Sequence, residues 1–299
     1  MIINMNNKDK LNPNWVTGLI DAEGCFYVRF AKSKNYKTGW WVQPCFQLGF
    51  HIRDKDLLLE IKSFFNEIGS VYPINKNKAL LYQVRNLSDI TKVIIPHFEK
   101  YPLITQKQSD FLLFKNIVEL MNKGEQFKKD SLVNIINLKA SLNRGLSDKL
   151  KLSFPEVTKV ERPKVDIPVN IDYNWIAGFF TGECCFYIIP SKNMSLRISI
   201  AQGSKDKLLM DNLRNTLKCG IVSKHSKNAV ILTISSFKNI YDDIIPFFIE
   251  YKIRGIKALD FKDFCKAAEL INKKAHLTLE GLEEIREIKR NMNKGRHIS

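Results

Sequence analysis

The sequence lacks the features that mark membrane, secreted and zinc-binding proteins. It contains no apolar run that approaches the length of a membrane-spanning helix. Its first residues, Met1–Lys8, are typical of neither a signal peptide nor an Arg-rich transit peptide. The six cysteines are scattered, without a CxxC pair or a paired Cys/His spacing, so we expect no zinc site and a reducing compartment. We also expect no membrane partner.

Acidic residues are scarce relative to basic ones. There are 47 Lys and Arg against 31 Asp and Glu, which leaves a net charge of +16 and a pI near 9.5. This balance favours a polyanionic partner, above all a nucleic acid. The 299 residues are enough for two domains, and 44% apolar residues are typical of a globular chain. Heavy use of Lys, Asn and Ile is what an A/T-rich, organellar gene would encode.

A fourteen-residue segment occurs twice, as Trp15–Val28 and as Trp175–Ile188. From Ile94 onward a constant offset of 150 superimposes the two halves, and it relates Lys107 to Lys257, Asp110 to Asp260, Lys139 to Lys289 and Asn143 to Asn293. Residues 151–170 between them are rich in proline and alternating charges, which predicts an extended linker. We therefore predict repeats at 1–150 and 171–299.

Each repeat shows the same order of patterns. In the first copy, β-branched and aromatic stretches predict strands at Cys25–Ala31 and Trp40–Phe50, with a second hairpin at Ser70–Arg85. Helical patterns lie near 54–68, 89–99 and 106–122, and a basic helix closes the copy. We predict an α+β fold of two αββαββα repeats, each with a four-stranded antiparallel sheet that has helices on one face and leaves the other face free.

The first helix of each repeat combines small residues with a terminal acid. Gly18 and Ala22 are four residues apart, as are Gly178 and Gly182, so each helix has a smooth face on which another backbone can pack closely. Such packing would set Glu23 and Glu183 side by side. Two carboxylates at helix C-termini repel each other and the helix dipole. Divalent cations would offset this and would favour phosphodiester hydrolysis; the alternative is a packing device with solvated glutamates.

Alternation along the predicted strands shows which side chains point away from the core. Tyr27, Arg29, Ala31 and Ser33 share one face of the first hairpin. The same alternation groups Gln43, Cys45, Gln47 and Gly49, and in the second copy Ser195, Arg197, Ser199 and Ala201. Faces of Arg, Gln, Ser and Tyr suit hydrogen bonds to base edges in a DNA groove. A face that is merely exposed to solvent is the alternative for any single strand.

The segment Val16–Gly24 resembles the nine-residue signature of the LAGLIDADG homing endonucleases, in their single-chain, two-repeat form. Tyr101–Lys107 and His276–Arg296 resemble segments of the fungal mitochondrial intron-encoded subgroup. The resemblance implies a monomer whose two sheets form a saddle over about two turns of double-stranded DNA, with the signature helices at a pseudo-twofold axis. It also implies a mitochondrial, organelle-encoded protein.

The resemblance assigns roles to individual residues. Glu23 and Glu183 match the signature's final acid, which is the metal ligand and catalytic carboxylate, and the carbonyls of Ala22 and Gly182 are further candidate ligands. Gln202 resembles a residue that positions water. Basic groups that stabilise phosphate charge are assigned to Lys107 and Lys257, for which simple phosphate anchoring or a solvated helix start is the alternative. We expect Mg²⁺ as cofactor, with Mn²⁺ substituting and Ca²⁺ supporting binding with little cleavage.

The free sheet faces become candidate DNA contacts. In the first copy these are Tyr27, Arg29, Ala31, Ser33, Gln43, Cys45, Gln47, Gly49, Ser70, Tyr72, Gln83 and Arg85. In the second copy they are Tyr187, Ile189, Ser191, Ser195, Arg197, Ser199, Ala201, Ser223, His225, Thr233 and Ser235.

Two positions depart from the signature. Its first acid is Asp21 in one copy but Thr181 in the other, so this position cannot be a required ligand in both halves. Cys184 stands where the pattern has glycine, and a residue that leaves a helix often takes a left-handed conformation that costs Cys about 1 kcal/mol or more. We therefore expect strain beside Glu183.

The sequence predicts a site-specific DNA endonuclease that makes a double-strand break by metal-dependent hydrolysis, one strand per glutamate. An intron RNA maturase and a cleavage-deficient DNA-binding protein of the same fold are the alternatives. Retention of both acids argues against these two, because binding alone would not keep a repulsive pair.

Overall fold

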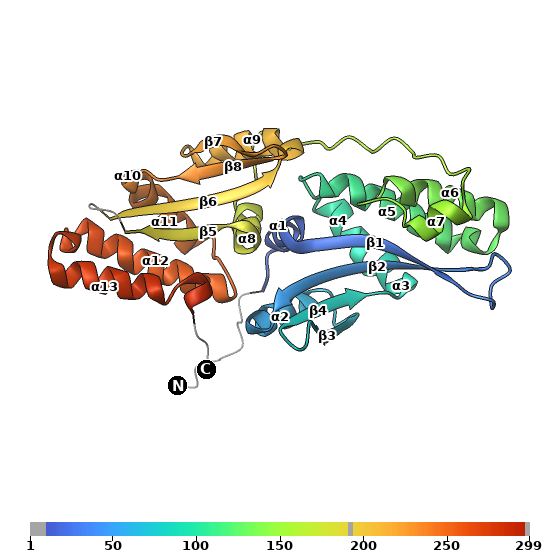
Figure 1. The fold of residues 1–299 in the computed structure, drawn as a ribbon, viewed down its shortest axis with the longest axis horizontal. Helices are drawn as coiled ribbons and strands as arrows, with labels where there is room; N and C mark the ends of the chain where they lie inside the picture. The colour runs from blue at the N-terminus through green and yellow to red at the C-terminus, as the bar shows by residue number, and fades with distance from the viewer. Residues whose placement is uncertain (1–9, 191–193, 297–299) are drawn as a thin grey trace. The chain divides into compact units, whose positions relative to one another are not determined.

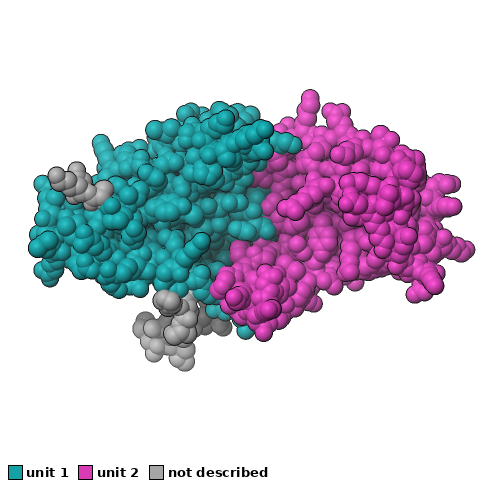
Figure 2. Space-filling model, in the orientation of Figure 1, with its two compact units in different colours: residues 1–23, 53–57, 167–299 teal, residues 24–52, 58–166 magenta. Residues whose placement is uncertain are grey.

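The computed structural model describes residues 10–190 and 194–296. Contacts divide the chain into two compact units, which are coloured separately in Figure 2. The first unit comprises residues 1–23, 53–57 and 167–299, and the second comprises residues 24–52 and 58–166. The predicted boundaries at 1–150, 151–170 and 171–299 follow sequence duplication rather than contacts, and they stay a prediction.

The second unit is built on a four-stranded antiparallel sheet (Figure 1). Its strands are β1 (Gly24–Lys32), β2 (Trp40–His51), β3 (Ser70–Ile74) and β4 (Ala79–Val84), in the order β1-β2-β4-β3. Phe26 pairs with Phe46 across the first hairpin, and Gln47 pairs with Gln83 across the centre of the sheet. β1 and β3 are therefore the edge strands.

An aromatic cluster fills the core between this sheet and its helices. The ring centroid of Phe26 lies 5.2 to 5.5 Å from those of Phe46, Phe98, Phe111 and Phe114. Aromatic rings of the strands and of the helices are therefore in direct contact in this core. The helices and turns that follow β2 are η1 (Ile52–Asp54), α2 (Lys55–Phe64), α3 (Leu87–Asp89), α4 (Ile95–Lys100), α5 (Lys107–Asn122), η3 (Glu125–Phe127), α6 (Lys129–Ser141) and α7 (Asp148–Ser153).

The first unit contains both signature helices, α1 (Pro13–Glu23) and α8 (Tyr173–Glu183). Its sheet has the order β5-β6-β8-β7, which repeats the topology of the other sheet. The strands are β5 (Cys185–Ile189), β6 (Ser195–Gly203), β7 (Ile221–Ser226) and β8 (Ala229–Ile234). The helices and turns are η4 (Ser204–Asp206), α9 (Lys207–Leu217), α10 (Phe237–Asn239), α11 (Ile245–Glu250), α12 (Ile256–Asn272), η6 (Ala275–Leu277), α13 (Leu279–Arg290) and η7 (Asn293–Gly295).

A π-helical turn interrupts the same helix in both repeats. The turn η2 (Ile90–Ile94) precedes α4, and η5 (Ile240–Ile244) precedes α11. Each is followed by a proline in the first turn of the next helix, Pro96 or Pro246. The backbone N–H of Ile95 bonds to Ile90, five residues back, rather than to residue four back. Sequence patterns predict one continuous helix here. The π-helical turn changes the hydrogen-bond pattern next to the proline, which has no backbone N–H to donate.

The predicted α+β architecture of two four-stranded antiparallel sheets with helices is confirmed. None of the helices in the described parts of the chain has the length and apolarity needed to span a membrane.

Candidate active site and nucleic-acid interface

The signature helices α1 and α8 pack backbone against backbone (Figure 1). A Cβ atom added to Gly18 would lie 2.1 Å from the carbonyl oxygen of Trp175, and one added to Gly178 would lie 1.9 Å from that of Trp15. Neither distance is compatible with a side chain at these positions. The small residues are therefore required for this packing, as the sequence predicts.

The same packing brings the acidic ends of the two helices together. A Cβ added to Gly182 would lie 2.3 Å from the Cβ of Ala22 and 3.1 Å from the Cγ of Glu23. The stem of Glu23 therefore lies against the residue that precedes Glu183. The Glu23 side chain is exposed and Glu183 is half-buried, so both lie where a ligand from solvent can reach them.

Lys257 reaches the end of α8. Its ammonium group donates a 2.6 Å hydrogen bond to the carbonyl of Gly182. The start of α12, on which Lys257 lies, is fixed by a 2.7 Å bond from the Ile256 N–H to a carboxylate oxygen of Asp54. A cation on the last carbonyls of a helix stabilises the negative end of its dipole. Lys257 is therefore within reach of any anion that the end of α8 receives.

The repeat-related Lys107 is the first residue of α5. Its backbone N–H donates to Thr105 Oγ1 at 3.1 Å, and its side chain is half-buried. Burial raises the pKa of the nearby Cys25 thiol, and the positive charge of Lys107 opposes that rise. Lys107 thus lies beside the strand that leaves the first signature helix, and its catalytic role stays a prediction.

The two departures from the signature have structural explanations. Asp21 is 4% exposed and accepts a 2.9 Å hydrogen bond from the indole nitrogen of Trp175 on the partner helix. Thr181 instead donates to the carbonyl of Ala177 at 2.8 Å and accepts from the N–H of Arg254. Asp21 thus links the two signature helices, whereas Thr181 bonds within α8 and to the segment before α12. That this position is not a required ligand in both halves stays a prediction.

The expectation of a left-handed backbone at Cys184 is wrong. Its φ of −76° and ψ of 153° are extended values that any residue adopts, because the chain passes from α8 directly into β5. The side chain is 1% exposed, and burial raises the pKa of its thiol to about 12. Cysteine therefore fills a buried space beside Glu183 without backbone strain.

Gln202 lies near the end of β6 and pairs with Val230 of β8. Alternation puts its side chain on the face of Ile198 and Ile200, opposite to that of Arg197, and the residue is half-buried. A water-positioning role for Gln202 stays a prediction.

The predicted polar face of the first repeat is a connected network across four strands. Gln83 donates to the hydroxyl of Tyr27 at 2.6 Å and to Gln47 at 3.1 Å, and it accepts from the hydroxyl of Tyr72 at 2.5 Å. Arg85 donates to the Tyr72 hydroxyl at 2.9 Å. These hydrogen bonds hold the side chains in fixed orientations on one face of the sheet; their contact with base edges stays a prediction.

Other members of this face differ in exposure. Arg29 is exposed, and its guanidinium lies 5.8 Å from the ring centroid of Trp41. Cys45 lies on the face by register but is 1% exposed, so contact with a ligand would need movement of its neighbours. Ser33 lies in the turn after β1, where its N–H bonds to the Gly39 carbonyl. By register Ala31, Gln43, Gly49 and Ser70 lie on this face as predicted.

The predicted face of the second repeat is also one side of a sheet. Tyr187 pairs with Arg197, and Ile189 with Ser195, and these four alternate with buried residues. Ser199 is 8% exposed and pairs with Thr233, while Ala201 and Ser223 both pair with Ile231. His225 lies at a register shift in β7, and Ser235 follows the end of β8. Ser191 lies outside the described residues.

The sequence prediction missed residues that share these faces. Cys25 and Trp41 lie on the face of Tyr27, and Cys185, Ile221 and Ile231 lie on that of Arg197. The same alternation would have found them, but the apolar ones do not look like base-reading side chains.

The oxygen atoms at the ends of α1 and α8 are chemically suited to a divalent cation. Within residues 10–190 and 194–296, no group of three or more His, Cys, Asp or Glu could hold a metal ion. Mg²⁺ commonly takes one or two protein carboxylates and completes its shell with water and substrate phosphate. Glu23 and Glu183 offer such carboxylates, and the Gly182 carbonyl keeps one lone pair beside its bond to Lys257.

The fold and this site define a two-repeat α+β protein with paired acidic helix ends. The family model described as LAGLIDADG endonuclease matches residues 16–118 and 176–268. The chain belongs to the LAGLIDADG endonuclease family, so the resemblance stated from the signature is confirmed.

Sequence relatives and solved structures agree with this assignment. Probable intron-encoded endonuclease 2 of Neurospora crassa is 40% identical over 294 residues, which cover 94% of this chain and 65% of that protein. The chain thus spans less than two thirds of this relative's length. The structure of the I-SmaMI LAGLIDADG homing endonuclease bound to cleaved DNA has a TM-score of 0.92 and 41% identity, and covers 96% of this chain and 99% of that chain.

A second structure of I-SmaMI, bound to an uncleaved DNA target in the presence of calcium ions, has a TM-score of 0.92 and 42% identity. It covers 96% of this chain and 100% of that chain.

Proposed function

We propose that this protein is a site-specific DNA endonuclease that cuts both strands of a long target, with one glutamate serving each strand. The observation that carries the proposal is the contact between the ends of α1 and α8, which puts the stem of Glu23 against Gly182 beside Glu183. Two acids kept together at helix C-termini are unfavourable by themselves. Their retention in both copies therefore supports a catalytic use.

We further propose that the site uses Mg²⁺, held by Glu23 and Glu183 with the carbonyls of Ala22 and Gly182. Such an ion would lower the pKa of a water molecule and polarise the scissile phosphodiester. Lys257, already bonded to Gly182, would stabilise negative charge that develops on the phosphate. Lys107 would do the same for the other strand.

Double-stranded DNA of about two turns is the proposed partner. The net charge of +16 favours phosphate contacts. The Tyr27–Gln83–Tyr72 network and the exposed Arg29 and Arg197 would read base edges. The solved relatives bound to DNA support this partner. We also propose that the protein acts as a monomer in the mitochondrion, since one chain supplies both signature helices and its relative is intron-encoded.

The experiment is a cleavage selection. The protein is incubated with a library of randomised duplexes and Mg²⁺, and the cut ends are sequenced. We expect cuts in both strands at one defined site, and a variant with both Glu23→Gln and Glu183→Gln as the matched control should yield none. Ca²⁺ in place of Mg²⁺ should permit binding with little cutting.

Selective binding without cutting by the wild-type protein in Mg²⁺ or Mn²⁺ would contradict the proposal. It would favour a cleavage-deficient DNA-binding protein. Binding confined to intron RNA would favour a maturase.

A further inference from the structure

An asparagine in the left-handed conformation lies just after α6, the last long helix of the first repeat. Asn143 has a φ of 51°, and its N–H donates to Asp110 at 2.8 Å. Its side-chain amide donates to the carbonyl of Phe26 in β1 at 2.6 Å. Arg162 binds the same Asp110 oxygen at 2.8 Å. The turn after α6 is thus tied to the edge strand of its own sheet.

The second repeat contains the same device. Asn293 has a φ of 56°, and its N–H donates to Asp260 at 3.0 Å. Its amide donates to the carbonyl of Phe186 in β5 at 3.1 Å. Here Arg296, from the turn itself, binds the aspartate at 2.7 Å. In the first repeat the arginine comes from the linker instead, so different segments support one geometry.

The residue after each asparagine is an exposed cation, Arg144 or Lys294. Arg144 makes no hydrogen bond or ion pair to any residue in the described ranges 10–190 and 194–296. Asn143, by contrast, is held on both its backbone and its side chain. The turn therefore fixes the backbone of a basic residue whose charge has no partner in the part of the chain that the structure describes.

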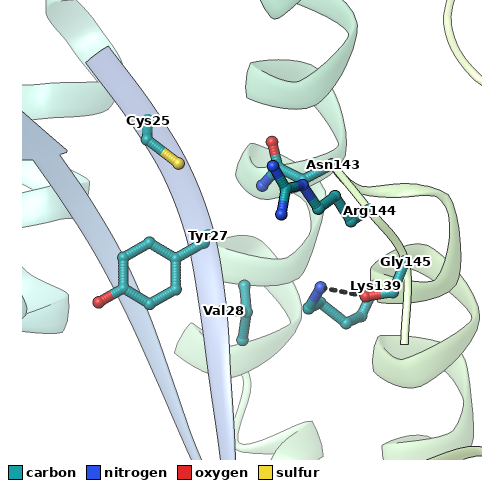
Figure 3. Close-up of a pocket in the computed structure, with 7 residues that line it drawn as sticks. All are labelled: Cys25, Tyr27, Val28, Lys139, Asn143, Arg144 and Gly145. Atoms are coloured by element: carbon teal, nitrogen blue, oxygen red, sulfur yellow. Dashed lines mark hydrogen bonds between the residues drawn. The ribbon is translucent and has the colours of Figure 1, made fainter. Parts of the chain in front are cut away.

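Arg144 lines a shallow pocket with Cys25, Tyr27 and Lys139 (Figure 3). Cys25 and Tyr27 come from β1, and Lys139 lies in the last turn of α6. Lys139 donates one hydrogen bond to the Gly145 carbonyl at 2.7 Å, drawn as the dashed line in Figure 3. An ammonium group has three donors, so two remain for a ligand.

The charges around this pocket favour an anion. Burial lowers the pKa of Lys139, and the nearby charge of Asp110 opposes that shift. The carboxylate of Asp110 is itself occupied by Arg162 and the Asn143 N–H. An anion in the pocket would meet two cations, Lys139 and Arg144.

We propose that this pocket binds a backbone phosphate of the DNA, and that the Asn143 turn positions Arg144 for it. This inference rests on the proposed DNA-binding function. β1 is an edge strand and Tyr27 belongs to the base-reading network, so a duplex whose base edges meet that network carries its phosphates along this edge. Lys294, beside the edge strand β5, has the same role in the second repeat.

The test is the salt dependence of DNA affinity. The probe is a fluorescein-labelled, non-specific duplex of about two turns, and its dissociation constant is measured by anisotropy between 50 and 200 mM NaCl for wild type, Arg144→Gln and Lys266→Gln. Losing one phosphate contact reduces the slope of log K against log salt by about 1. Because the salt concentration rises fourfold, the DNA affinity of wild type should fall by a factor about fourfold larger than that of Arg144→Gln.

Lys266→Gln is the matched control. It removes the same charge from a lysine that is paired with Glu284 at 3.0 Å on the outer helices, and it should keep the wild-type slope. Equal slopes for Arg144→Gln and wild type would overturn the inference. A wild-type protein without salt-dependent DNA binding would instead overturn the proposed function.

A second measurement separates positioning from charge. Asn143→Gly keeps a residue that accepts φ of 51° but removes the amide that holds Phe26. Asn143→Gly should reduce the salt slope as much as Arg144→Gln does. The double variant should have nearly the same slope as either single variant. Independent, additive losses of affinity would contradict positioning of Arg144 by Asn143.

Discussion

At the scale of single residues, Asp21 shows how an acid inside the signature serves structure. Its carboxylate is buried and accepts the indole N–H of Trp175 from the neighbouring helix. An unsatisfied buried donor costs about 1–3 kcal/mol. Asp21→Ala should therefore lower the free energy of unfolding by about that amount, measured by urea denaturation.

The control for this prediction removes both partners. Asp21→Ala combined with Trp175→Phe should cost less than the sum of the two single changes, because no orphaned donor is left. An Asp21→Ala protein as stable as wild type would refute this role of Asp21.

Cys184 illustrates a side chain kept for the space that it fills. Because its backbone is extended and its side chain is 1% exposed, Cys184→Gly should cost about 1–2 kcal/mol of stability through lost burial and added chain entropy. Cys184→Ala should cost less. A glycine variant more stable than wild type would contradict this prediction and would indicate backbone strain at Cys184.

The buried thiol also predicts a pH dependence. Burial raises the pKa of Cys184 from 9.0 to about 12. Its stability contribution is thus complete below pH 9, where the thiol is protonated in the folded and unfolded states. It is lost as the pH rises toward 12, since the unfolded state releases the proton first. Denaturation curves of wild type and Cys184→Ala should converge over this range; a constant difference would contradict the shift.

At the scale of elements, the α1–α8 pair depends on glycine rather than on side-chain contacts. A Cβ at Gly178 would meet the backbone of Trp15 at 1.9 Å, and backbone atoms cannot move aside as a flexible side chain can. Gly178→Ala should destabilise the protein by about 3 kcal/mol or more. It should also reduce cleavage, because the ends of both helices would separate.

Gly203 is the control for Gly178. It has a φ of −58°, and a Cβ there would meet no atom within 4 Å. Gly203→Ala should leave the melting temperature unchanged or slightly raised. Equal changes in melting temperature for Gly178→Ala and Gly203→Ala would show that the α1–α8 pair tolerates a side chain at Gly178.

Much of the element order follows from the sequence, and what does not has a physical reason. Alternation and turn residues specify both hairpins, and the four-residue spacing of Gly18 and Ala22 specifies the close helix pair. The extended backbone of Cys184 depends on the strand that follows directly after α8, and the bond from Lys257 to Gly182 depends on packing between residues 75 positions apart. No local pattern contains that information.

At the scale of the whole molecule, duplication supplies two sheet faces whose polar residues have diverged. Arg29 and Arg197 lie on the two faces, and both are exposed. Arg29→Ala and Arg197→Ala should each cost about 1–3 kcal/mol at a few base-pair positions while changing non-specific binding much less. Binding selections on single-base variants of the target measure this. A loss that is uniform across sequences would mean that these arginines contact phosphate alone.

The central claim is that the glutamates at the ends of α1 and α8 carry out hydrolysis. The most direct measurement compares double-strand cleavage by wild type, Glu23→Gln and Glu183→Gln in Mg²⁺, with the affinity of each for the same DNA. Each substitution should nearly abolish double-strand cleavage while leaving affinity within a few-fold, because binding draws on phosphate contacts elsewhere. Cleavage by either variant at the wild-type rate would contradict the account.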